Sequence, residues 1–527
     1  MNTVKLQAHK GVASDCPENT IASFECAALQ GYDVIELDLD YTRDCKIIVL
    51  HDSTINRTAR NSDGSKIETE IKIRDITLEQ ARKFDFGLGL SNKYKGEGIP
   101  LFKDVLDLAL KNKIKLKIDN KITAFPEEIL NILFDEISGY EEYVSITSNK
   151  LDFAEKCLKL NNKISIDYDG EITEEVLIKL TSLLPCEKLT VWLPYECSAT
   201  SWVTIPFANK ERAELVKRYA RLGLWIISDC ADFEAAVNEL SPYIVETDGT
   251  VKPEINSSCR FDMHTHSKSS HDSQAEVEDV AKSDKICGFA VTDHCDIEFF
   301  NELDLNKIAD SSISDARKAD EKSEKTVLHG IEMGEAFWHR EVEAEILQKH
   351  CFDVVIGSVH AVKFENFEMP YSTIDFAKEG VEFSKNYLNK YFDDVYKMLN
   401  ECNFDVLAHL TCPLRYINGK YLLNISSMDY KDKIQKILAF IIEHKIALEL
   451  NTSCVFEGSN YCEYMPEQWI IELYKTMGGY LITTGSDAHI AENAANSFDS
   501  LYSLLRELGF KNIFYFKNRL PIQCSLL

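Results

Sequence analysis

Short apolar runs recur along the whole chain, and most are separated by stretches long enough to hold a helix. In the first half they lie at residues 4–8, 34–40, 47–50, 114–118, 144–147, 164–168, 189–193, 224–227 and 243–245. Runs of this length with polar flanks are typical of buried strands. After Pro17, which suits the first turn of a helix, apolar residues recur at helical spacing as far as Leu29, and Gly31 ends that helix. The first half is therefore predicted to be an α/β barrel.

In the second half the apolar runs end in side chains that bind metals. Runs 260–263, 289–292, 327–331, 354–359, 406–408 and 481–486 lead to His264, His294, Glu332, His360, His409 and the Asp487/His489 pair. In a parallel barrel the carboxyl ends of the strands meet at one face. His264 and His266 lie two apart on a strand, so they point to the same side and can share one ion. The pattern predicts a multinuclear metal centre.

Length and charge limit the possible classes of protein. A chain of 527 residues is too long for one ordinary core, so we expect a first domain at 1–251, a polar linker at 252–259 and a second domain at 260–527. The net charge is −28 and no basic run occurs, which argues against nucleic acid and anionic membranes as partners. No run has the length of a membrane span, and the start of the chain lacks a secretory signal pattern. The 16 cysteines have no paired spacing, so we expect a cytoplasmic protein with reduced thiols.

The first half carries a second group of candidate functional residues. Glu36 and Asp38 lie two apart in an apolar run, on one side of a strand. His9 closes the first run and His51 closes the third. Paired carboxylates can bind a divalent cation, and two histidines can supply an acid and a base. A solvated edge strand could also carry two such acids, but the Ile and Leu neighbours disfavour that alternative.

Four segments of the first half resemble the glycerophosphodiester phosphodiesterases, in the order and spacing of that family. They are Ala8-His9-Lys10-Gly11, Pro17-Glu18-Asn19-Thr20, Ile35-Glu36-Leu37-Asp38 and the run from Leu50 to Thr58. The resemblance implies a TIM (β/α)8 barrel in which Glu36, Asp38 and Asp119 hold one Ca²⁺ or Mg²⁺ ion. It implies that His9 and His51 are the catalytic acid/base pair, and that Lys121 contacts the phosphate. It further implies that Lys10 and Asn19 bind the substrate.

Three positions depart from the pattern of that family. Lys10 stands where an arginine is usual, and it offers a point charge in place of a planar fork. Asp119 replaces a longer glutamate. The aromatic residue usual on the eighth strand is replaced around Ser228 and Asp229. These changes keep open the alternative that the first domain binds phosphodiesters without cleaving them.

The second half, from residue 259 to the C-terminus, resembles the PHP family and in particular its histidinol-phosphatase branch. The resemblance lies in the strand ends named above and in segments 330–335, 356–360 and 409–416. It implies a distorted (β/α)7 barrel with three divalent ions, which could be Zn, Fe or Mn. One ion would take His264, His266, Glu332 and Asp487, and a second would take Glu332, His360 and His409. The third would take His294 and His489 with either His271 or Asp272.

Three further residues are candidates near these ligands. Arg415 lies six residues beyond His409 and is suited to bind phosphate in catalysis, although a surface ion pair is the alternative. Glu335 is expected to recognise a cationic amine of the substrate, by analogy with the fold alone. Asp293 precedes His294 and is expected to orient it.

Together these features predict a phosphoric ester hydrolase that acts on small phosphate esters. The second domain is expected to convert L-histidinol phosphate to L-histidinol. The first domain is expected to cleave glycerophosphodiesters to glycerol 3-phosphate and an alcohol. An alternative joins the two domains in sequence, the first cutting a lipid-derived diester and the second removing the phosphate. The oligomeric state does not follow from the sequence.

Overall fold

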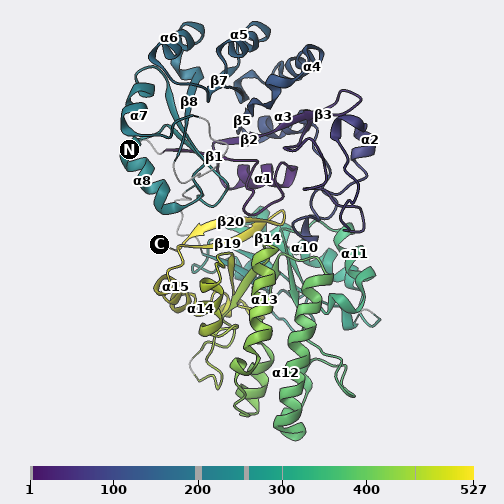
Figure 1. Ribbon diagram of the computed structural model, residues 1–527. Coiled ribbons are helices and arrows are strands. Elements are labelled where there is room, and N and C mark those ends of the chain that lie inside the picture. Colours follow the sequence, from purple (N-terminus) through teal and green to yellow (C-terminus); the bar gives the residue numbers. More distant parts are fainter. Residues whose placement is uncertain (1–3, 196–204, 254–259, 300, 457, 527) are drawn as a thin grey trace. The chain divides into compact units, whose positions relative to one another are not determined.

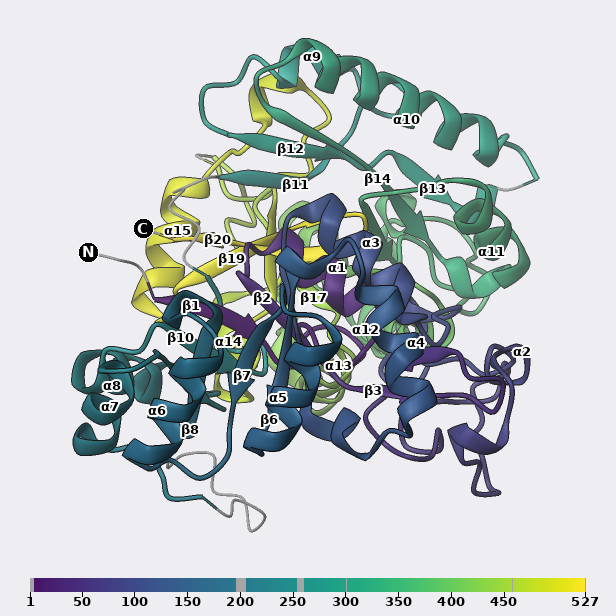
Figure 2. The same cartoon turned by 90° about the horizontal axis from the view of Figure 1, so that it is seen from above.

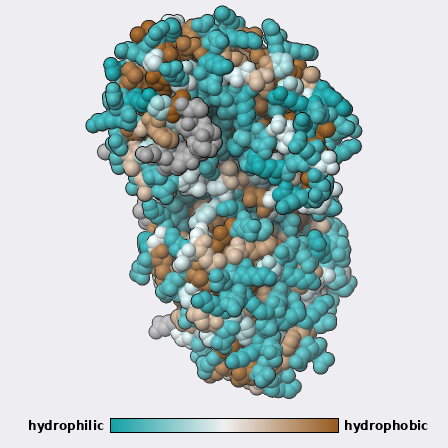
Figure 3. Space-filling view, viewed as in Figure 1, coloured by the Kyte–Doolittle hydropathy of each residue, from teal (hydrophilic) through white to brown (hydrophobic). Residues whose placement is uncertain are grey.

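The computed structural model describes residues 4–195, 205–253, 260–299, 301–456 and 458–526. The chain divides into two compact units, Met1–Glu254 and Ile255–Leu527 (Figure 1). Hydrophilic residues cover much of the face drawn in Figure 3, with apolar residues scattered among them. No helix in the described part of the chain is long and apolar enough to cross a membrane.

The first unit is a closed barrel of eight parallel strands, as predicted. The strand order is β1-β10-β9-β8-β7-β6-β5-β2. The strands are β1 (Lys5–Ala8), β2 (Val34–Leu37), β5 (Lys115–Ile118), β6 (Val144–Ser148), β7 (Ser165–Tyr168), β8 (Leu189–Pro194), β9 (Arg221–Trp225) and β10 (Ile244–Thr247). The helices are α1 (Ile21–Leu29), α2 (Leu78–Ala81), α3 (Phe102–Asn112), α4 (Glu127–Ile137), α5 (Leu151–Leu160), α6 (Glu174–Leu183), α7 (Lys210–Lys217) and α8 (Cys230–Leu240).

One predicted strand of this unit lies outside the barrel. The apolar run at 47–50 forms β4 (Ile47–Val49), which pairs antiparallel with β3 (Leu39–Tyr41). The run at 34–40 is accordingly divided between β2 and β3. Ile48 and Leu50 pack with buried residues of the following insertion, such as Ile73 and Phe86. The predicted strand is present, but it is not a barrel strand, because an apolar run buried against an insertion has the same pattern as a strand of the barrel.

The first helix begins later than predicted. Thr20 is its N-cap and accepts a hydrogen bond from the Ser23 backbone N–H (3.3 Å), so α1 starts at Ile21. Pro17 therefore precedes the helix, and its carbonyl accepts a hydrogen bond from the Thr20 hydroxyl (2.7 Å). The irregular segment that results leaves Glu18 and Asn19 outside the helix.

The predicted linker is only partly described. Its residues 254–259 lie outside the described part of the chain. Lys252, by contrast, belongs to the first unit, where its buried ammonium group pairs with the buried carboxylate of Asp15.

The second unit is a nearly closed parallel barrel whose main path has seven strands in the order β11-β12-β14-β15-β16-β17-β18. These are β11 (Phe261–Thr265), β12 (Gly288–Val291), β14 (Thr326–Gly334), β15 (Val354–Ser358), β16 (Val406–Leu407), β17 (Ala447–Asn451) and β18 (Ile482–Gly485). The short β13 (His294–Asp296) also pairs with β14. The first and last strands meet where Asp487 N–H donates to the His264 carbonyl (2.8 Å) and His266 N–H donates to the Ala488 carbonyl (2.9 Å).

Helices and a C-terminal hairpin complete the second unit. The helices are α9 (Val277–Val280), α10 (Leu305–Lys322), α11 (Arg340–Lys349), α12 (Phe376–Glu401), α13 (Lys431–Glu443), α14 (Gln468–Thr476) and α15 (Phe498–Glu507). Helix α10 packs along β14, and Figure 2 shows it beside that strand. Strands β19 (Asn512–Lys517) and β20 (Leu520–Ser525) form the antiparallel hairpin.

The hairpin packs at the end of the barrel where the strands begin. Its Tyr515 ring stacks on Phe261, at the start of β11, with ring centroids 3.9 Å apart. At the hairpin turn, Arg519 Nε donates to the buried Asp405 carboxylate (2.9 Å), just before β16. The backbone N–H of Asn518 donates to the Asp353 carboxylate (3.0 Å), just before β15. The opposite end of the barrel, where the strands finish, carries the candidate metal ligands.

Replacing Arg519 with alanine should therefore destabilise the second unit. The change removes charge-assisted hydrogen bonds to a buried carboxylate, which are worth about 2 kcal/mol. For a unit of this size that corresponds to a fall in its melting temperature of about 4–8 °C, measured by calorimetry on the full chain. Lys511→Ala, at an exposed site before β19, is the matched control. An equal melting temperature in both variants would show that the hydrogen bonds of Arg519 contribute nothing to stability.

Candidate active sites

Three carboxylates meet at the carboxyl ends of two neighbouring strands in the first unit. Glu36 lies on β2, Asp38 follows β2, and Asp119 follows β5. One oxygen of each lies within 4.8 Å of the others, as the motif predicted. Burial, and then the charge of Asp38, raise the pKa of Glu36 to about 8. The donor set fits a hard divalent cation, which would relieve the repulsion between these oxygens.

His9 follows β1 and faces this cluster. Its Nδ1 lies 2.6 Å from Asp248 Oδ1, and its Nε2 lies 3.9 Å from Glu36 Oε2. Burial opposes protonation, but the hydrogen bond to Asp248 and the charge of Glu36 outweigh it and raise the pKa of His9 to about 9. The Ser228 hydroxyl donates to the other oxygen of Asp248 (2.8 Å). Asp248 therefore fixes the ring so that Nε2 is directed to the carboxylates.

Ser228 corrects one detail of the sequence prediction. It follows β9, which is the seventh barrel strand along the chain, whereas the prediction placed this segment on the eighth. An aromatic residue, Trp225, is the last residue of β9. The prediction counted the run at 47–50 as a barrel strand, so its strand numbers after that run are one too high.

The second histidine, His51, follows β4 and is also paired with a carboxylate. Its Nδ1 lies 2.6 Å from Asp52 Oδ1. Arg57 Nε donates to Asp52 Oδ2 (2.6 Å), and Arg57 also binds both oxygens of Glu18 (2.6 and 2.8 Å). Burial acts against ionisation of Asp52, but the hydrogen bonds from Arg57 and His51 lower its pKa to about 2. Both histidines thus have an ionised partner on Nδ1.

The three remaining predicted residues of this site hold its carboxylates. Lys121 Nζ donates to Asp38 Oδ1 (2.7 Å) and to the His51 carbonyl (2.8 Å). Asn19 Nδ2 donates to Asp38 Oδ2 (2.9 Å). The backbone N–H of Lys10 donates to Glu36 (3.0 Å), and its ammonium group lies 3.7 Å from Glu18. The structure therefore brings every predicted residue of the first site together.

Glu332 is the centre of the cluster in the second unit. Its Oε1 lies 2.9 Å from His409 Nε2 and 3.3 Å from His360 Nε2. Its Oε2 lies 2.8 Å from His294 Nδ1 and 3.4 Å from His264 Nε2. Pairing of β13 with β14 explains the closest contact, because His294 stands directly opposite Glu332. Glu332 is completely buried.

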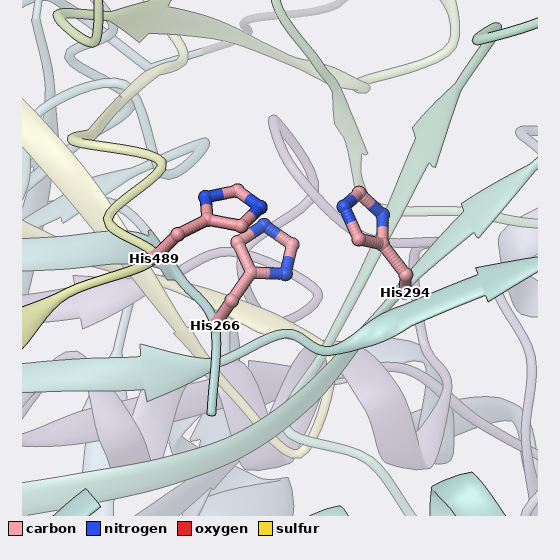
Figure 4. Close-up of side chains that lie close together, drawn as sticks. All are labelled: His266, His294 and His489. Atoms are coloured by element: carbon pink, nitrogen blue, oxygen red, sulfur yellow. The ribbon is translucent and has the colours of Figure 1, made fainter. Parts of the chain in front are cut away.

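Four overlapping groups around Glu332 each bring their ligand atoms within 4.8 Å of one another. They are His264/Glu332/His409, His264/His266/Asp487, His266/His294/His489 and His294/Asp296/His360. Figure 4 shows the third group, with the His266 and His489 rings close together and His294 beside them. The sets predicted for the first two ions are thus gathered here. The prediction grouped His294 with His489 but did not include His266 in that group.

The choice between His271 and Asp272 is also addressed by the geometry. Asp272 Oδ2 lies 3.2 Å from His489 Nε2 and 3.7 Å from His294 Nε2. The ring centroid of His271 lies 5.5 Å from that of His294. The carboxylate therefore bridges the two histidines, and Asp272 is the better placed ligand.

The residues of this cluster fit divalent metal ions. Glu332 Oε2 and His294 Nδ1 are buried and lie close together, yet neither has a hydrogen-bond partner among the described residues. Buried nitrogen and oxygen atoms that converge and are left without hydrogen bonds, as these two are, form the arrangement that a bound ion would satisfy. Mixed nitrogen and oxygen donors suit Zn, Fe and Mn.

Models of two known families match the two halves of the chain. Residues 9–224 match the model of the glycerophosphoryl diester phosphodiesterase (GDPD) family. Residues 262–453 match the model of the PHP domain. The chain joins a GDPD domain to a PHP domain.

Curated relatives cover the two halves separately. A probable histidinol-phosphatase of Thermotoga maritima is 28% identical over 254 residues, which are 48% of this chain and 93% of the relative. A glycerophosphodiester phosphodiesterase of Caldanaerobacter subterraneus is 37% identical over 145 residues, 27% of this chain. In that second match the chain spans 56% of the length of the relative.

Solved structures resemble each half at low identity. One is the histidinol phosphate phosphatase of Lactococcus lactis, described as complexed with Zn, L-histidinol and phosphate. It is 23% identical, with a TM-score of 0.39, and the match covers 50% of this chain and 98% of that one. Another is a putative glycerophosphoryl diester phosphodiesterase of Silicibacter pomeroyi. It is 17% identical, with a TM-score of 0.39, over 47% of this chain and 90% of that one.

Two carboxylates of the PHP domain were missed by the sequence reasoning. Asp296 Oδ1 lies 2.9 Å from His360 Nδ1. Gly334 stands opposite Asp296 on β14, and a Cβ there would lie 2.2 Å from the same oxygen, so the carboxylate needs a glycine at this position. Glu449, on β17, lies 2.7 Å from His264 Nδ1. Each is a carboxylate in or beside an apolar strand run, which is the signal that could have identified it.

Three further residues that the sequence singled out in the PHP domain lie beside the metal-ligand cluster in different environments: Arg415, Glu335 and Asp293. Arg415 is half-buried beside Tyr416, with its guanidinium 5.6 Å from the ring centroid, and among the described residues no carboxylate forms an ion pair with it. Glu335 is completely buried, and its Oε1 accepts the backbone N–H groups of His360 and Ala361. This carboxylate holds the segment that carries His360. Asp293 accepts hydrogen bonds from Ser267 and Ser270, and so positions the segment that leads to Asp272.

Replacing Asp248 with asparagine should lower the pKa of His9. The negative charge of Asp248 favours protonated His9, so the neutral amide should let the pKa fall from about 9 towards the ordinary value of 6.5. Protonation is then lost at a lower pH than in the wild type. Histidine titration by NMR on the metal-free chain measures this, with the His9 signal assigned by its loss in His9→Gln. The exposed Asp152→Asn is the matched control, and a fall of the same size there would contradict the assignment.

Proposed function

We propose that this phosphoric ester hydrolase carries two separate activities. The PHP domain hydrolyses a phosphate monoester, L-histidinol phosphate. The GDPD domain hydrolyses glycerophosphodiesters to glycerol 3-phosphate and an alcohol. The observation that carries the first activity is the buried Glu332 carboxylate with four imidazole nitrogens within 3.4 Å of its oxygens.

In the PHP domain the ligands would hold divalent ions at the mouth of the barrel. When bound, such ions neutralise phosphate charge and lower the pKa of coordinated water. Arg415 is suited to bind the phosphoryl oxygens, because its half-buried guanidinium lacks an ion-pair partner among the described residues. The 28% identical histidinol-phosphatase relative, of which the match covers 93%, supports histidinol phosphate as the substrate.

In the GDPD domain the three carboxylates would hold one Ca²⁺ or Mg²⁺ ion, which supplies positive charge for the phosphodiester. His9 and His51 are placed to exchange protons with the substrate. One removes the proton of the attacking glycerol hydroxyl, and the other donates a proton to the leaving alkoxide. Asp248 and Asp52 hold these rings by Nδ1, so Nε2 is the atom that exchanges the proton.

A binding module without catalysis is disfavoured by the same geometry. Binding a phosphodiester requires positive charge, but it does not require two histidines that are each oriented by a carboxylate. Consecutive action of the two domains is a second candidate, favoured by their fusion in one chain. Glycerol 3-phosphate, the product of the first domain, is itself a phosphate monoester.

The two activities should be lost independently. Glu332→Gln should reduce phosphate release from L-histidinol phosphate by more than the about 100-fold typical of a residue that only supports a ligand. It should leave glycerol 3-phosphate formation from glycerophosphocholine intact, and Glu36→Gln should give the reverse pattern. Product assays on the purified full chain, supplied with Mn²⁺ or Mg²⁺, measure both reactions. Loss of both activities in either variant would refute two separate sites.

The same assay with wild-type protein selects between the candidate substrates. Faster phosphate release from L-histidinol phosphate than from glycerol 3-phosphate supports the first proposal. The opposite preference supports consecutive action on one diester. Release from neither compound would reject both assignments of the PHP domain.

Arg415→Lys should weaken substrate binding without removing metal ions. Lysine keeps the charge but cannot make two parallel hydrogen bonds to a phosphoryl group. Loss of one charged hydrogen bond, about 1.5–3 kcal/mol, corresponds to a roughly 10- to 150-fold fall in kcat/KM. Metal content, measured by mass spectrometry, should equal that of the wild type. An unchanged kcat/KM would place Arg415 outside the phosphate site.

A further inference from the structure

Glu449 contacts two candidate metal ligands that come from different strands. Its Oε1 lies 2.7 Å from His264 Nδ1, at the end of β11. Its Oε2 accepts the backbone N–H of His409, just after β16, at 2.7 Å. Asn451 Nδ2 also donates to Oε1 (3.4 Å). The residue is almost completely buried.

We propose that Glu449 positions one ligand in each of two metal subsites and thereby couples the loading of two ions. His264 belongs to the group with His266 and Asp487 and also to the group with Glu332 and His409, so it is shared, whereas His409 belongs to the second group alone. The inference rests on the metal assignment of the proposed function. It does not depend on which phosphate ester is the substrate.

The contact with His264 determines which ring nitrogen faces the ion. A carboxylate only accepts hydrogen bonds, so His264 Nδ1 must carry a proton. In the neutral ring that binds a metal, Nε2 then keeps its lone pair, and it lies 3.4 Å from Glu332 Oε2. A histidine held in this way by a carboxylate is oriented for metal binding through its other nitrogen.

The contact with His409 acts on the backbone. His409 has a positive φ of 20°, which is uncommon for a residue with a side chain. The hydrogen bond from its N–H to Glu449 holds that conformation. The ring is thereby placed with Nε2 at 2.9 Å from Glu332 Oε1.

Space for the Glu449 carboxylate depends on a glycine in the neighbouring strand. Gly485 ends β18, which pairs with β17. A Cβ at Gly485 would lie 2.2 Å from Glu449 Oε1 and 2.6 Å from the Cβ of His264. Any side chain there would push the carboxylate away from His264.

Substitution by glutamine separates this role from simple packing. The carboxylate is surrounded by donors, from His264, His409 and Asn451. Glutamine has a single acceptor oxygen, so its NH₂ group would have to face a donor. Asp296 differs, because its hydrogen bond to His360 needs one acceptor, which asparagine can supply.

The test is Zn²⁺ binding to the metal-free full chain, by calorimetry and by mass spectrometric metal content. Glu449→Gln should lower the affinity for two of the bound Zn²⁺ ions, each by about 10- to 100-fold. Asp296→Asn should weaken at most one. Gly485→Ala should weaken the same two equivalents, although Glu449 is still present. Glu443→Gln, at the exposed end of α13, should bind like the wild type.

Wild-type binding in Glu449→Gln, or the loss of a single equivalent, would overturn the coupling. If the variants do not fold, as judged by circular dichroism, the Zn²⁺-loaded wild type still provides a test. Its NMR spectrum should show His264 with a proton on Nδ1 and the metal on Nε2. The opposite assignment would overturn the role of Glu449. Because these measurements use no substrate, they are independent of the assays for the two esterase activities.

Discussion

The architecture of the PHP domain depends on one buried carboxylate. Glu332 has no exposed surface, and an isolated carboxylate in such a place would cost several kcal/mol. Burial disfavours its charge, but the surrounding histidines, above all His264 and His360, lower its pKa well below the ordinary value. The cluster is thus stable only if positive charge stays beside Glu332, as protons on imidazole or as metal ions. The histidines stay beside Glu332 only if several elements end at the same level of the barrel: β11, β13, β14, β15 and the loop after β16.

The GDPD domain meets the same constraint with the opposite balance of charge. Burial, and then the charge of Asp38, raise the pKa of Glu36 even though Lys121 and Asn19 hold Asp38. Each domain also uses carboxylates bonded to histidine Nδ1 to orient part of its site, Asp248 and Asp52 in the first and Glu449 and Asp296 in the second. They leave Nε2 directed to the centre, for a proton in one domain and for a metal in the other.

The sequence predicted both barrels and nearly all the residues that the structure brings together, because those residues end apolar runs at parallel strand termini. The sequence-based prediction failed where an apolar pattern can arise from more than one kind of burial. The run at 47–50 is apolar because an insertion covers it, and no periodicity distinguishes that from a barrel strand. Glu449 lies inside an apolar run as Glu36 does, but no neighbouring acid or matching motif marked it. Its role depends on contacts with β11, β16 and β18, which are set by the three-dimensional arrangement alone.

The departure at Lys10 can now be weighed in terms of available charge. Arg57 lies close by, and it could in principle replace the arginine that is usual after the first histidine. Its Nε and both terminal nitrogens are, however, already bonded to Asp52 and Glu18. Lys10 is held only loosely, at 3.7 Å from Glu18. It follows that a phosphodiester entering this site would meet Lys10 as a point charge. Its orientation would depend on the ion between Glu36, Asp38 and Asp119 more than on an arginine fork.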